Sequence, residues 1–320
     1  MRFFGVWLLL CSVALWAQNT SEITGTVVDS SGLAVPGAQV EVTQITTGLT
    51  RATVTGVDGT YVLPSLPVGP YKLDVKKEGF ATFVQSGIVL QVDTNPTIEV
   101  TLKVGSVSEQ VQVEASAAMV ETHSTGVGQV VDEARVVDLP LNGRYVTDLV
   151  GLAGAAAIAP GADLISAKNY PNEAVYSVAG GQAIGTTYLL DGGTHNDPFN
   201  NLNLPLPFPD ALQEFKVETS ALPAQYGEHS GGAVNAVTRS GGNQFHGDVF
   251  EFVRNYIFNA RNPGALARDS LKRNQFGGTL GGPIKKDKLF FLSDIREISF
   301  DPIPLQPSRL FPRRRCSRGI

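Results

Sequence analysis

The chain is poor in the residue types that build disulfide scaffolds and metal sites. Cys11 and Cys316 are its only cysteines and lie close to its two ends, which excludes a disulfide scaffold or a thiolate metal site in the body of the protein. The four histidines lie far apart along the chain: His123, His195, His229 and His246. Because they lack the H-E-x-x-H spacing of zinc enzymes, we expect no metal.

The chain also lacks an excess of positive charge and the motifs of common catalytic sites. Its formal net charge is −5, and its Lys and Arg residues are evenly spread, which argues against a nucleic-acid partner. The glycine pairs do not follow a strand and open a helix, as a phosphate loop would, and no Ser-His-Asp arrangement is suggested. We therefore predict neither an enzyme nor a bound cofactor.

Long apolar runs are missing except at the start, MRFFGVWLLLCSVALWAQ. Arg2, an apolar run and the small residue Ala17 predict a secretory signal peptide over residues 1–17. The run is too short for a spanning helix, which needs about 20 apolar residues. A lipoprotein signal ending at Cys11 is disfavoured by the bulky Leu10 before it.

Residues 22–104 show the two-residue alternation of half-buried strands. Tyr71, Leu73 and Val75 alternate with charged residues, and similar patterns occur near residues 38–43 and 97–104. Turn signals such as Asp58-Gly59 separate these segments. About seven short strands in roughly 80 residues predict a small β-sandwich.

Two stretches of this region carry a resemblance. ITGTVVDSSGLAVPGAQVEV at 23–42 and TGVDGTYVLPSLPVGPYKLDVKKEGF at 55–80 resemble the carboxypeptidase regulatory-like domain, a transthyretin-like and carbohydrate-binding-like β-sandwich. The resemblance implies an accessory domain without catalysis, and we favour a structural or partner-docking role. Sugar binding would need exposed aromatic rings, for which this region offers four candidates: Tyr61, Tyr71, Phe80 and Phe83.

Residues 105–167 change character. A strand is expected within 107–114. Apolar spacing over 130–139 fits either a helix or a strand, and we favour the helix. A helical spacing returns at 145–152, and residues 153–167 read as a loop.

Residues 176–243 return to short strands punctuated by glycine pairs, which allow close backbone approach and sharp turns. Strands are expected at 176–178 and 187–190, followed by an irregular proline-rich loop at 198–209. The strand that comes next alternates apolar Phe215 and Val217 with charged residues, which predicts one charged face.

This half of the chain resembles the plug domain of TonB-dependent outer-membrane receptors. The matching stretches are LPLNGRYVTDLVGLAGA at 139–155, YLLDGG at 188–193 and EFKVETSALPAQYGEHSGGAVNAVTRSGGN at 214–243. The L-P-x-N-G-R motif together with the preceding sandwich resembles the Oar-like branch. The resemblance implies an α+β plug over 105–242 and the start of a β-barrel at 243.

The remaining residues are expected to form barrel strands at 245–256, 274–280 and 288–298. Turn-like Asn-Pro-Gly, Gly-Gly-Pro and Lys-Lys-Asp separate these segments. About three or four strands fit before residue 300, whereas the smallest bacterial barrels use about 8. We therefore expect a mainly β protein with an incomplete transmembrane barrel over 243–300 and an aberrant or disordered tail over 301–320. This fits a truncated or frame-shifted product of a longer receptor.

The resemblance supplies candidate functional residues. Residues 109–115 resemble a TonB box, a segment that pairs with the energising partner by strand addition; alternatively they form the first strand of the plug. Asn142-Gly143-Arg144 either positions a charge at the plug–barrel interface or ends a helix with a solvated arginine. Asp191-Gly192-Gly193 is either a ligand-facing loop or, as we favour, a structural turn. The TonB-box-like candidates are Glu109, Gln110, Val111, Gln112, Val113, Glu114 and Ala115. The remaining plug-motif candidates are Gly231, Gly232 and Asn235.

A polar loop supplies the candidate ligand contacts, since loops on a rigid scaffold commonly carry function. They are His195, Asn196, Asp197, Asn200, Asn201 and Asn203. The resemblance implies a receptor in the outer membrane, in contact with its lipid, with the sandwich and plug on the periplasmic side. Its partners would be a TonB-type energising complex and an extracellular siderophore, oligosaccharide, peptide or cobalamin. The alternative is a secreted carbohydrate-binding or adhesin-type β-module protein.

Overall fold

A computed structural model describes residues 20–106, 110–114, 126–139, 141, 143–159, 175–222, 224–226, 231–261, 268 and 270–300. The chain forms two compact units, described separately below. The first runs to Gly247 and includes Leu280–Ser293, and the second comprises Asp248–Thr279 and the residues from Asp294 onward. None of the helices in these described ranges is long and apolar enough to cross a membrane.

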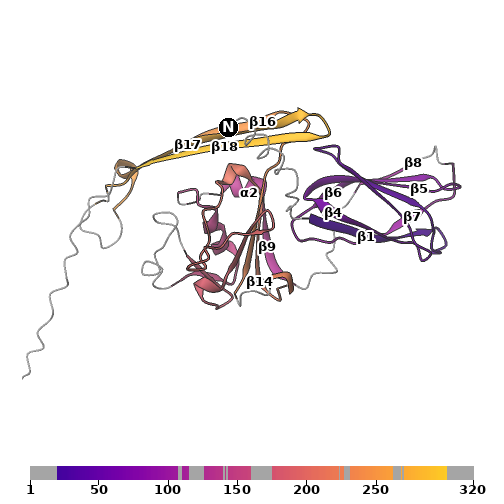
Figure 1. Cartoon of the computed structure of the whole chain (residues 1–320), viewed down its shortest axis with the longest axis horizontal. Helices are drawn as coiled ribbons and strands as arrows, with labels where there is room; N and C mark the ends of the chain where they lie inside the picture. Colours follow the sequence, from indigo (N-terminus) through magenta and orange to yellow (C-terminus); the bar gives the residue numbers. More distant parts are fainter. Residues whose placement is uncertain are drawn as a thin grey trace, which may run out of the picture. The chain divides into compact units, whose positions relative to one another are not determined.

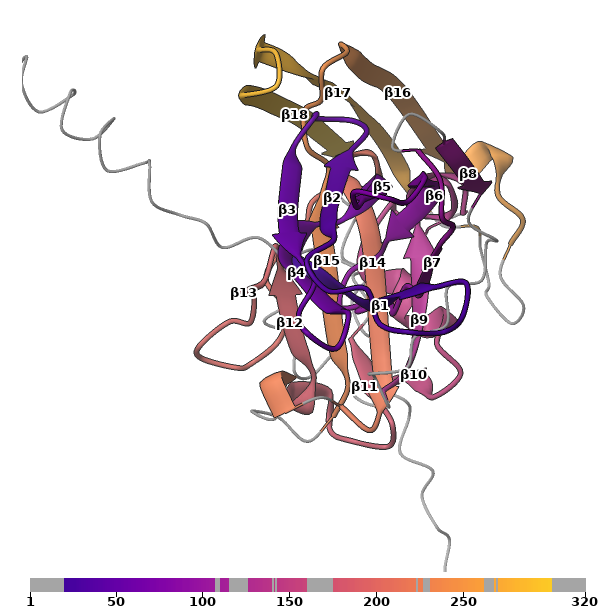
Figure 2. The same ribbon diagram turned by 90° about the vertical axis from the view of Figure 1, so that its right-hand side faces the viewer.

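The N-terminal region is a two-sheet β-sandwich, as predicted (Figures 1 and 2). One sheet has the order β4-β1-β7, and the other has the order β3-β2-β5-β6-β8. The strands are β1 (Thr20–Asp29), β2 (Gln39–Gln44), β3 (Thr50–Val54), β4 (Thr60–Pro67), β5 (Gly69–Lys76), β6 (Thr82–Leu90), β7 (Val100–Leu102) and β8 (Gln110–Glu114).

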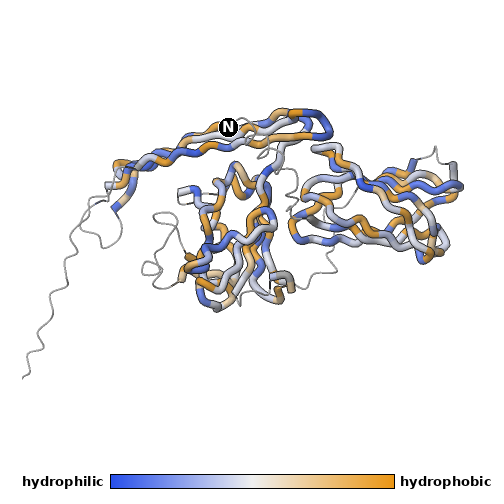
Figure 3. Tube along the Cα trace, viewed as in Figure 1, coloured by the Kyte–Doolittle hydropathy of each residue, from blue (hydrophilic) through white to orange (hydrophobic). Residues whose placement is uncertain are grey.

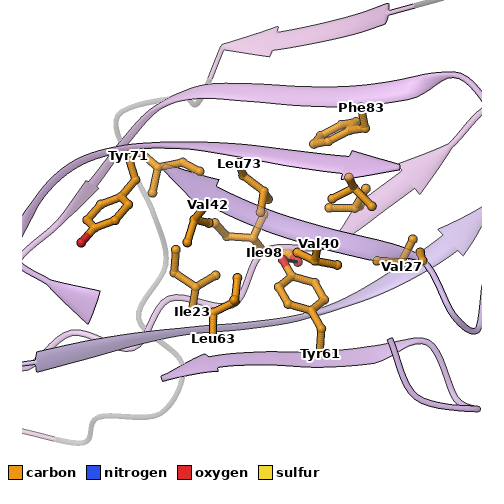
Figure 4. Close-up of a cluster of buried hydrophobic side chains, with 14 of the residues drawn as sticks. Ile23, Val27, Val40, Val42, Tyr61, Leu63, Tyr71, Leu73, Phe83 and Ile98 are labelled. Carbon is orange, nitrogen blue, oxygen red and sulfur yellow. Dashed lines mark hydrogen bonds between the residues drawn. The ribbon is translucent and has the colours of Figure 1, made fainter. Parts of the chain in front are cut away.

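The sandwich core follows directly from the alternation in the sequence. Val42 and Leu73 come from one sheet, Ile23 and Leu63 come from the other, and their side chains meet in the middle (Figure 4). Period-two strands place every second side chain on one face, so that face becomes a continuous apolar layer. The tyrosine hydroxyls of this layer are hydrogen-bonded: the Tyr61 hydroxyl donates to the Ile98 carbonyl at 2.9 Å, and the Tyr71 hydroxyl donates to the Pro67 carbonyl at 2.8 Å.

The second region is an α+β domain around a five-stranded sheet with the order β13-β12-β15-β14-β9. The central strand β15 pairs in parallel with β12 and antiparallel with β14. A separate antiparallel pair, β10-β11, packs into the same core through Tyr176 and Val178. The strands are β9 (Val127–Asp132), β10 (Ala156–Ile158), β11 (Tyr176–Val178), β12 (Thr187–Leu190), β13 (Gly193–Thr194), β14 (Leu212–Ser220) and β15 (Ala233–Thr238). The helices are α2 (Glu133–Asp138) and the 3-10 turns η2 (Val146–Leu152), η3 (Ala183–Gly185), η4 (Pro209–Ala211) and η5 (Ala224–Tyr226).

Two sequence expectations in this domain need correction. The helix predicted for 130–139 is a strand up to Asp132 and a helix only after it, because the Asp132 side chain caps the helix by accepting from the Arg135 N–H at 3.0 Å. The loop expected at 153–167 contains the strand β10, whose small residues give no periodic signal but whose backbone pairs with β11.

The glycine pair Gly231-Gly232 permits close backbone approach within this domain. A Cβ on Gly231 would lie 2.5 Å from the Gly185 carbonyl oxygen, and one on Gly232 would lie 2.4 Å from the Val178 side chain. No side chain fits at such distances, so glycine is required where the chain enters β15.

The last strands, β16 (His246–Asn255), β17 (Lys272–Lys285) and β18 (Leu289–Phe300), form a three-stranded sheet, with the 3-10 turn η6 (Tyr256–Phe258) after β16. The Gly-Gly-Pro turn expected at 281–283 is wrong, because these residues lie inside β17. The two glycines leave room for neighbouring rings. A Cβ on Gly281 would lie 2.6 Å from the His246 ring, and a Cβ on Gly282 would lie 2.4 Å from the Phe245 ring.

Strand β17 buries several polar side chains and exposes several apolar ones. Its polar side chains Arg273, Gln275 and Thr279 are buried, whereas Phe276, Leu280 and Ile284 are exposed. In the hydropathy view, apolar and polar stretches are interspersed in the sheet formed by β16–β18 (Figure 3). Apolar-out and polar-in alternation is the arrangement of strands that face lipid on one side.

Candidate functional site

The polar loop after β12 is held together by its own hydrogen bonds. Asn196 is buried and uses its whole amide: its Oδ1 accepts from the Tyr188 N–H at 2.7 Å, and its Nδ2 donates to the Thr186 and Asn201 carbonyls, both at 2.9 Å. Asn203 is also buried and forms a β-bridge with Asn196. These two candidate ligand residues therefore build the loop.

The other loop candidates lie nearer the surface but are also partly engaged. The Asp197 carboxylate accepts from the Phe199 N–H at 2.9 Å, and the Asn200 Oδ1 accepts from the Leu202 N–H at 3.0 Å. Asn201 donates to the Ile184 carbonyl, and His195 shares a hydrogen bond with the Pro205 carbonyl at 3.0 Å.

Phe199 is a candidate that the sequence reasoning missed. Its side chain is 94% exposed at this otherwise polar loop. The only sequence signal was an aromatic residue among the prolines and asparagines of 198–203. An exposed aromatic ring offers a contact surface for a ligand.

Asp191 connects the turn after β12 to the end of β15. Its backbone has a positive φ of 50°, and its carboxylate accepts from both the N–H and the hydroxyl of Thr238 at 2.8 Å. The Asp191-Gly192 turn is thereby fastened to the end of the parallel neighbour β15. This geometry corresponds to the structural turn, the interpretation that we favoured.

Arg144 is buried in an ion pair and is not solvated. Its Nη2 lies 2.5 Å from the Asp210 Oδ2, and both side chains are less than 10% exposed. Arg144 has a positive φ of 55° after Gly143, so the turn aims the guanidinium inward. The interpretation with a solvated arginine is wrong, because the pair ties this turn to η4, the entry into β14. Asn142 lies outside the described residues.

The charged face of β14 is buried. Glu214, Lys216 and Glu218 alternate along the strand, and each is less than 10% exposed. Lys216 forms an ion pair with Glu218 at 2.8 Å. The expected charged face is therefore present, but it is covered.

Part of this cover comes from residues 91–95, which follow β6. Both carboxylate oxygens of Glu214 accept from the Val92 N–H, at 3.2 and 3.0 Å. Lys216 donates to the Asp93 carbonyl at 3.2 Å, and the Asn235 amide donates to the Asp93 carboxylate at 2.9 Å. The plug-motif residue Asn235 is thus a partner of this contact.

Burial dominates the electrostatics of this face. The pKa of Glu214 is raised to about 7, chiefly because burial removes water from its carboxylate. The Val92 N–H and Lys216 act in the opposite direction, and the negative charges of Asp93 and Asp132 contribute to the rise. Glu214 is therefore a carboxyl group that titrates near neutral pH.

The TonB-box-like segment lies in the sandwich. Residues Gln110–Glu114 form β8, which pairs in parallel with β6 from Thr82↔Gln110 to Ser86↔Glu114. The alternative assignment as the first strand of the plug is wrong, because the plug sheet ends at β9. Glu109 and Ala115 lie outside the described residues.

The junction to the last strands is fixed by Asn243. Its amide donates to the Asp287 carboxylate at 2.8 Å and accepts from the Asp287 N–H at 2.9 Å, which fastens the turn between β17 and β18. Just before it, a Cβ on Gly241 would lie 2.3 Å from the Phe291 carbonyl oxygen. Glycine is therefore required where the chain passes this turn.

Within the described residues, His, Cys, Asp and Glu side chains form no cluster of three or more that would hold a metal ion. His195 and His246 lie in separate elements, and the other two histidines lie outside the described ranges.

Comparison with known families defines the class of protein. A sequence model described as "Carboxypeptidase regulatory-like domain" matches residues 22–103, and one described as "Outer membrane beta barrel domain" matches residues 237–307. The sandwich and the strands β16–β18 are therefore parts of an outer-membrane β-barrel protein.

The "TonB-dependent transporter Oar" of Myxococcus xanthus is 32% identical over 300 residues, which is 89% of this chain. These matches place the chain with the TonB-dependent outer-membrane receptors of the Oar type. The chain spans 27% of the length of that relative.

Solved structures show weaker similarity. The siderophore receptor PirA from Acinetobacter baumannii aligns with 57% of this chain and 26% of its own, at 18% identity and a TM-score of 0.44. Hydroxyquinol 1,2-dioxygenase from Pseudomonas putida DLL-E4 aligns with 29% of this chain and 59% of its own, at 13% identity and a TM-score of 0.24. The family assignment rests on the sequence matches.

Proposed function

We propose that the chain is the N-terminal portion of a receptor that binds an extracellular ligand and imports it with energy from the inner membrane. The observation that carries this proposal is the 32% identity to a TonB-dependent transporter over 300 residues, a match that includes the plug region. A TonB-type complex would supply the energy, and the sandwich and plug would lie on the periplasmic side.

The burial pattern of β17 supports this function. A strand that exposes Phe276, Leu280 and Ile284 while burying Arg273 and Gln275 is suited to hydrocarbon outside and a polar lumen inside. In water such an apolar stripe would favour aggregation.

We further propose that the ligand contacts the loop after β12 through its outward groups. Asn196 and Asn203 are committed to the loop itself, so contact falls to His195, Asp197 and the exposed ring of Phe199. A loop that is held internally by hydrogen bonds is preorganised, which lowers the entropic cost of binding.

The aromatic residues of the sandwich disfavour the carbohydrate-binding alternative. Tyr61, Tyr71 and Phe83 are buried, and Phe80 packs against the same core. Across residues 20–106 these rings therefore offer no exposed face on which a sugar would stack.

Uptake by the source bacterium tests the proposal. Labelled ferric siderophore, oligosaccharide, peptide and cobalamin are supplied to wild-type cells, to a deletion of this gene and to a deletion of the TonB-type protein. We expect one class of compound to lose uptake in both deletions. Unchanged uptake of all four classes in the gene deletion would sink the proposal.

A matched pair of variants tests the loop. The gene deletion is complemented with Phe199→Ala or with Val57→Ala, a similarly exposed residue of the sandwich. Phe199→Ala should weaken uptake about tenfold, since a buried aromatic contact contributes roughly 1–2 kcal/mol. Equal uptake by the two variants would remove Phe199 from the ligand site.

A further inference from the structure

The turn at residues 91–95, which follows β6, is shaped by contacts within the sandwich. The Gln91 carbonyl accepts from the Ser21 hydroxyl at 2.8 Å. At the other end of the turn, the Asn95 Oδ1 accepts from the Glu22 N–H at 3.2 Å. Both partners belong to β1, so the sandwich itself supplies the bonds that hold this turn in place.

The same turn offers hydrogen-bonding groups to the plug, and both partners lie in the first compact unit. The Val92 N–H donates to the two carboxylate oxygens of Glu214, at 3.2 and 3.0 Å. Asp93, whose backbone has a positive φ of 53°, accepts twice: its carbonyl from Lys216 at 3.2 Å and its carboxylate from Asn235 at 2.9 Å. The turn thus matches polar side chains of β14 and β15 group by group.

The apolar part of this contact is small. Val92 is fully buried with Val68 and Val237, in a cluster that is separate from the larger cores of the sandwich and the plug. Apolar burial stabilises in proportion to the area removed from water, so three valines contribute far less than either core. A second contact, from the Asn243 N–H to the Thr46 carbonyl at 3.0 Å, is made by backbone alone and does not titrate. A pH response of the contact therefore depends on the polar side chains around residues 91–95.

Glu214 is the carboxyl group at the centre of these polar side chains. Acidic groups face it from two other elements: Asp93 from the turn and Asp132 from β9. Its neighbouring cation, Lys216, lies on the same strand and is also paired with Glu218 at 2.8 Å. An ionised Glu214 therefore meets two like charges and a cation that it shares, at a buried position.

We propose that the contact between residues 91–95 and β14 is a reversible latch between the sandwich and the plug, closed while Glu214 is neutral and released when it ionises. Neutral Glu214 accepts the Val92 N–H without burying a charge. Release returns the carboxyl group to water, where its pKa falls from about 7 toward its ordinary value of 4.5. The closed state thus binds the proton more tightly, so the latch is favoured at low pH and weakens as pH rises through about 7.

Native-state hydrogen exchange of the full chain, purified in detergent, tests the latch through the Val92 amide. Its protection factor, corrected for the intrinsic pH dependence of exchange, should fall at least about tenfold from pH 5 to pH 8. Glu214→Gln should abolish this fall, because the amide side chain cannot ionise. Glu99→Gln is the matched control, since Glu99 is an exposed carboxyl group of the sandwich, and it should respond to pH like wild type.

Two reference amides distinguish release of the latch from unfolding. The Thr187 N–H donates to the Gly232 carbonyl at 2.9 Å inside the plug, and the Glu22 N–H donates to Asn95 inside the sandwich. Release exposes the Val92 amide without exposing these two, so at pH 8 Val92 should be at least about tenfold less protected than either. Protection of Val92 equal to that of Thr187 would mean that the plug has to unfold, and protection equal to that of Glu22 would mean that the turn itself unravels. Either result would overturn the inference.

The wild-type measurement decides the question even if Glu214→Gln does not fold. A protection factor of Val92 that stays constant between pH 5 and pH 8 would overturn the latch. No transported compound or energising protein takes part in this experiment, so its outcome is independent of the proposed function.

Discussion

The sandwich and the plug use the same kind of strand in opposite ways. In the sandwich, Tyr71 and Leu73 are fully buried, while Lys72 between them is exposed to water. In the plug, the alternate positions of β14 hold Glu214, Lys216 and Glu218, and these are buried as well. The charged face of the sandwich strand is in contact with water, whereas the charged face of the plug strand is buried.

This difference changes what stabilises each region. A buried apolar side chain contributes through its removal from water, which is insensitive to pH. A buried charge is costly unless it has a partner, so the plug depends on specific pairs such as Arg144 with Asp210. The plug should therefore be the region that responds to loss of a partner and to pH.

The largest effect is expected from breaking the buried pair. Arg144→Ala leaves the Asp210 carboxylate buried without its cation, which should destabilise the plug by about 3–5 kcal/mol. Native-state hydrogen exchange of amides in β14 and η2 would measure this loss. Arg135→Ala is the control, because its ion pair with Asp132 is exposed and should contribute less than about 1 kcal/mol. A small effect of Arg144→Ala would contradict the dependence of the plug on this pair.

The corresponding change in the sandwich removes apolar packing. Leu73→Ala should cost about 2–5 kcal/mol by creating a cavity in a core that has no exposure at this position. Hydrogen exchange of β2 and β5 amides should report the loss equally at pH 5 and pH 8. Val54→Ala on the exposed side of β3 should change stability by less than about 0.5 kcal/mol. If the cost of Leu73→Ala depended on pH, the contrast between the two regions would not hold.

The sequence predicted the sandwich better than the plug, for a physical reason. Alternation around Leu73 is a local signal, and both the strand and its buried face follow from it. The charged face of β14 was also predicted, but its burial depends on Val92 and Asp93, more than 120 residues away in the chain. Local pattern cannot report such a partner.

The candidate sites show the same limit. The turn after Gly143 was evident from the sequence, but the partner of Arg144 was not, because Asp210 lies 66 residues further along. Residues 110–114 were correctly expected to be a strand, whereas their parallel pairing with β6 is a tertiary contact that the local pattern does not report. Sequence therefore located the elements, and tertiary contacts assigned their neighbours.

The smallest of the three effects, and the one most specific to the plug, is the titration of Glu214. Its pKa near 7 in the folded chain lies above its ordinary value of 4.5, so the folded state retains a proton that the unfolded state has lost between those pH values. Stability should therefore fall as pH rises through this window, by up to about 3 kcal/mol when complete above pH 7. Glu214→Gln cannot ionise, so its advantage over wild type should grow from pH 5 to pH 8.

Urea unfolding of wild type and variant at both pH values measures that difference. Glu99→Gln in the sandwich is the matched control, because the Glu99 side chain is exposed. Its difference from wild type should not change with pH. If Glu214→Gln behaved like Glu99→Gln, the carboxylate of Glu214 would be as well stabilised as one in water. The buried charged face of β14 would then be electrostatically equivalent to the solvent-exposed charged face of the sandwich.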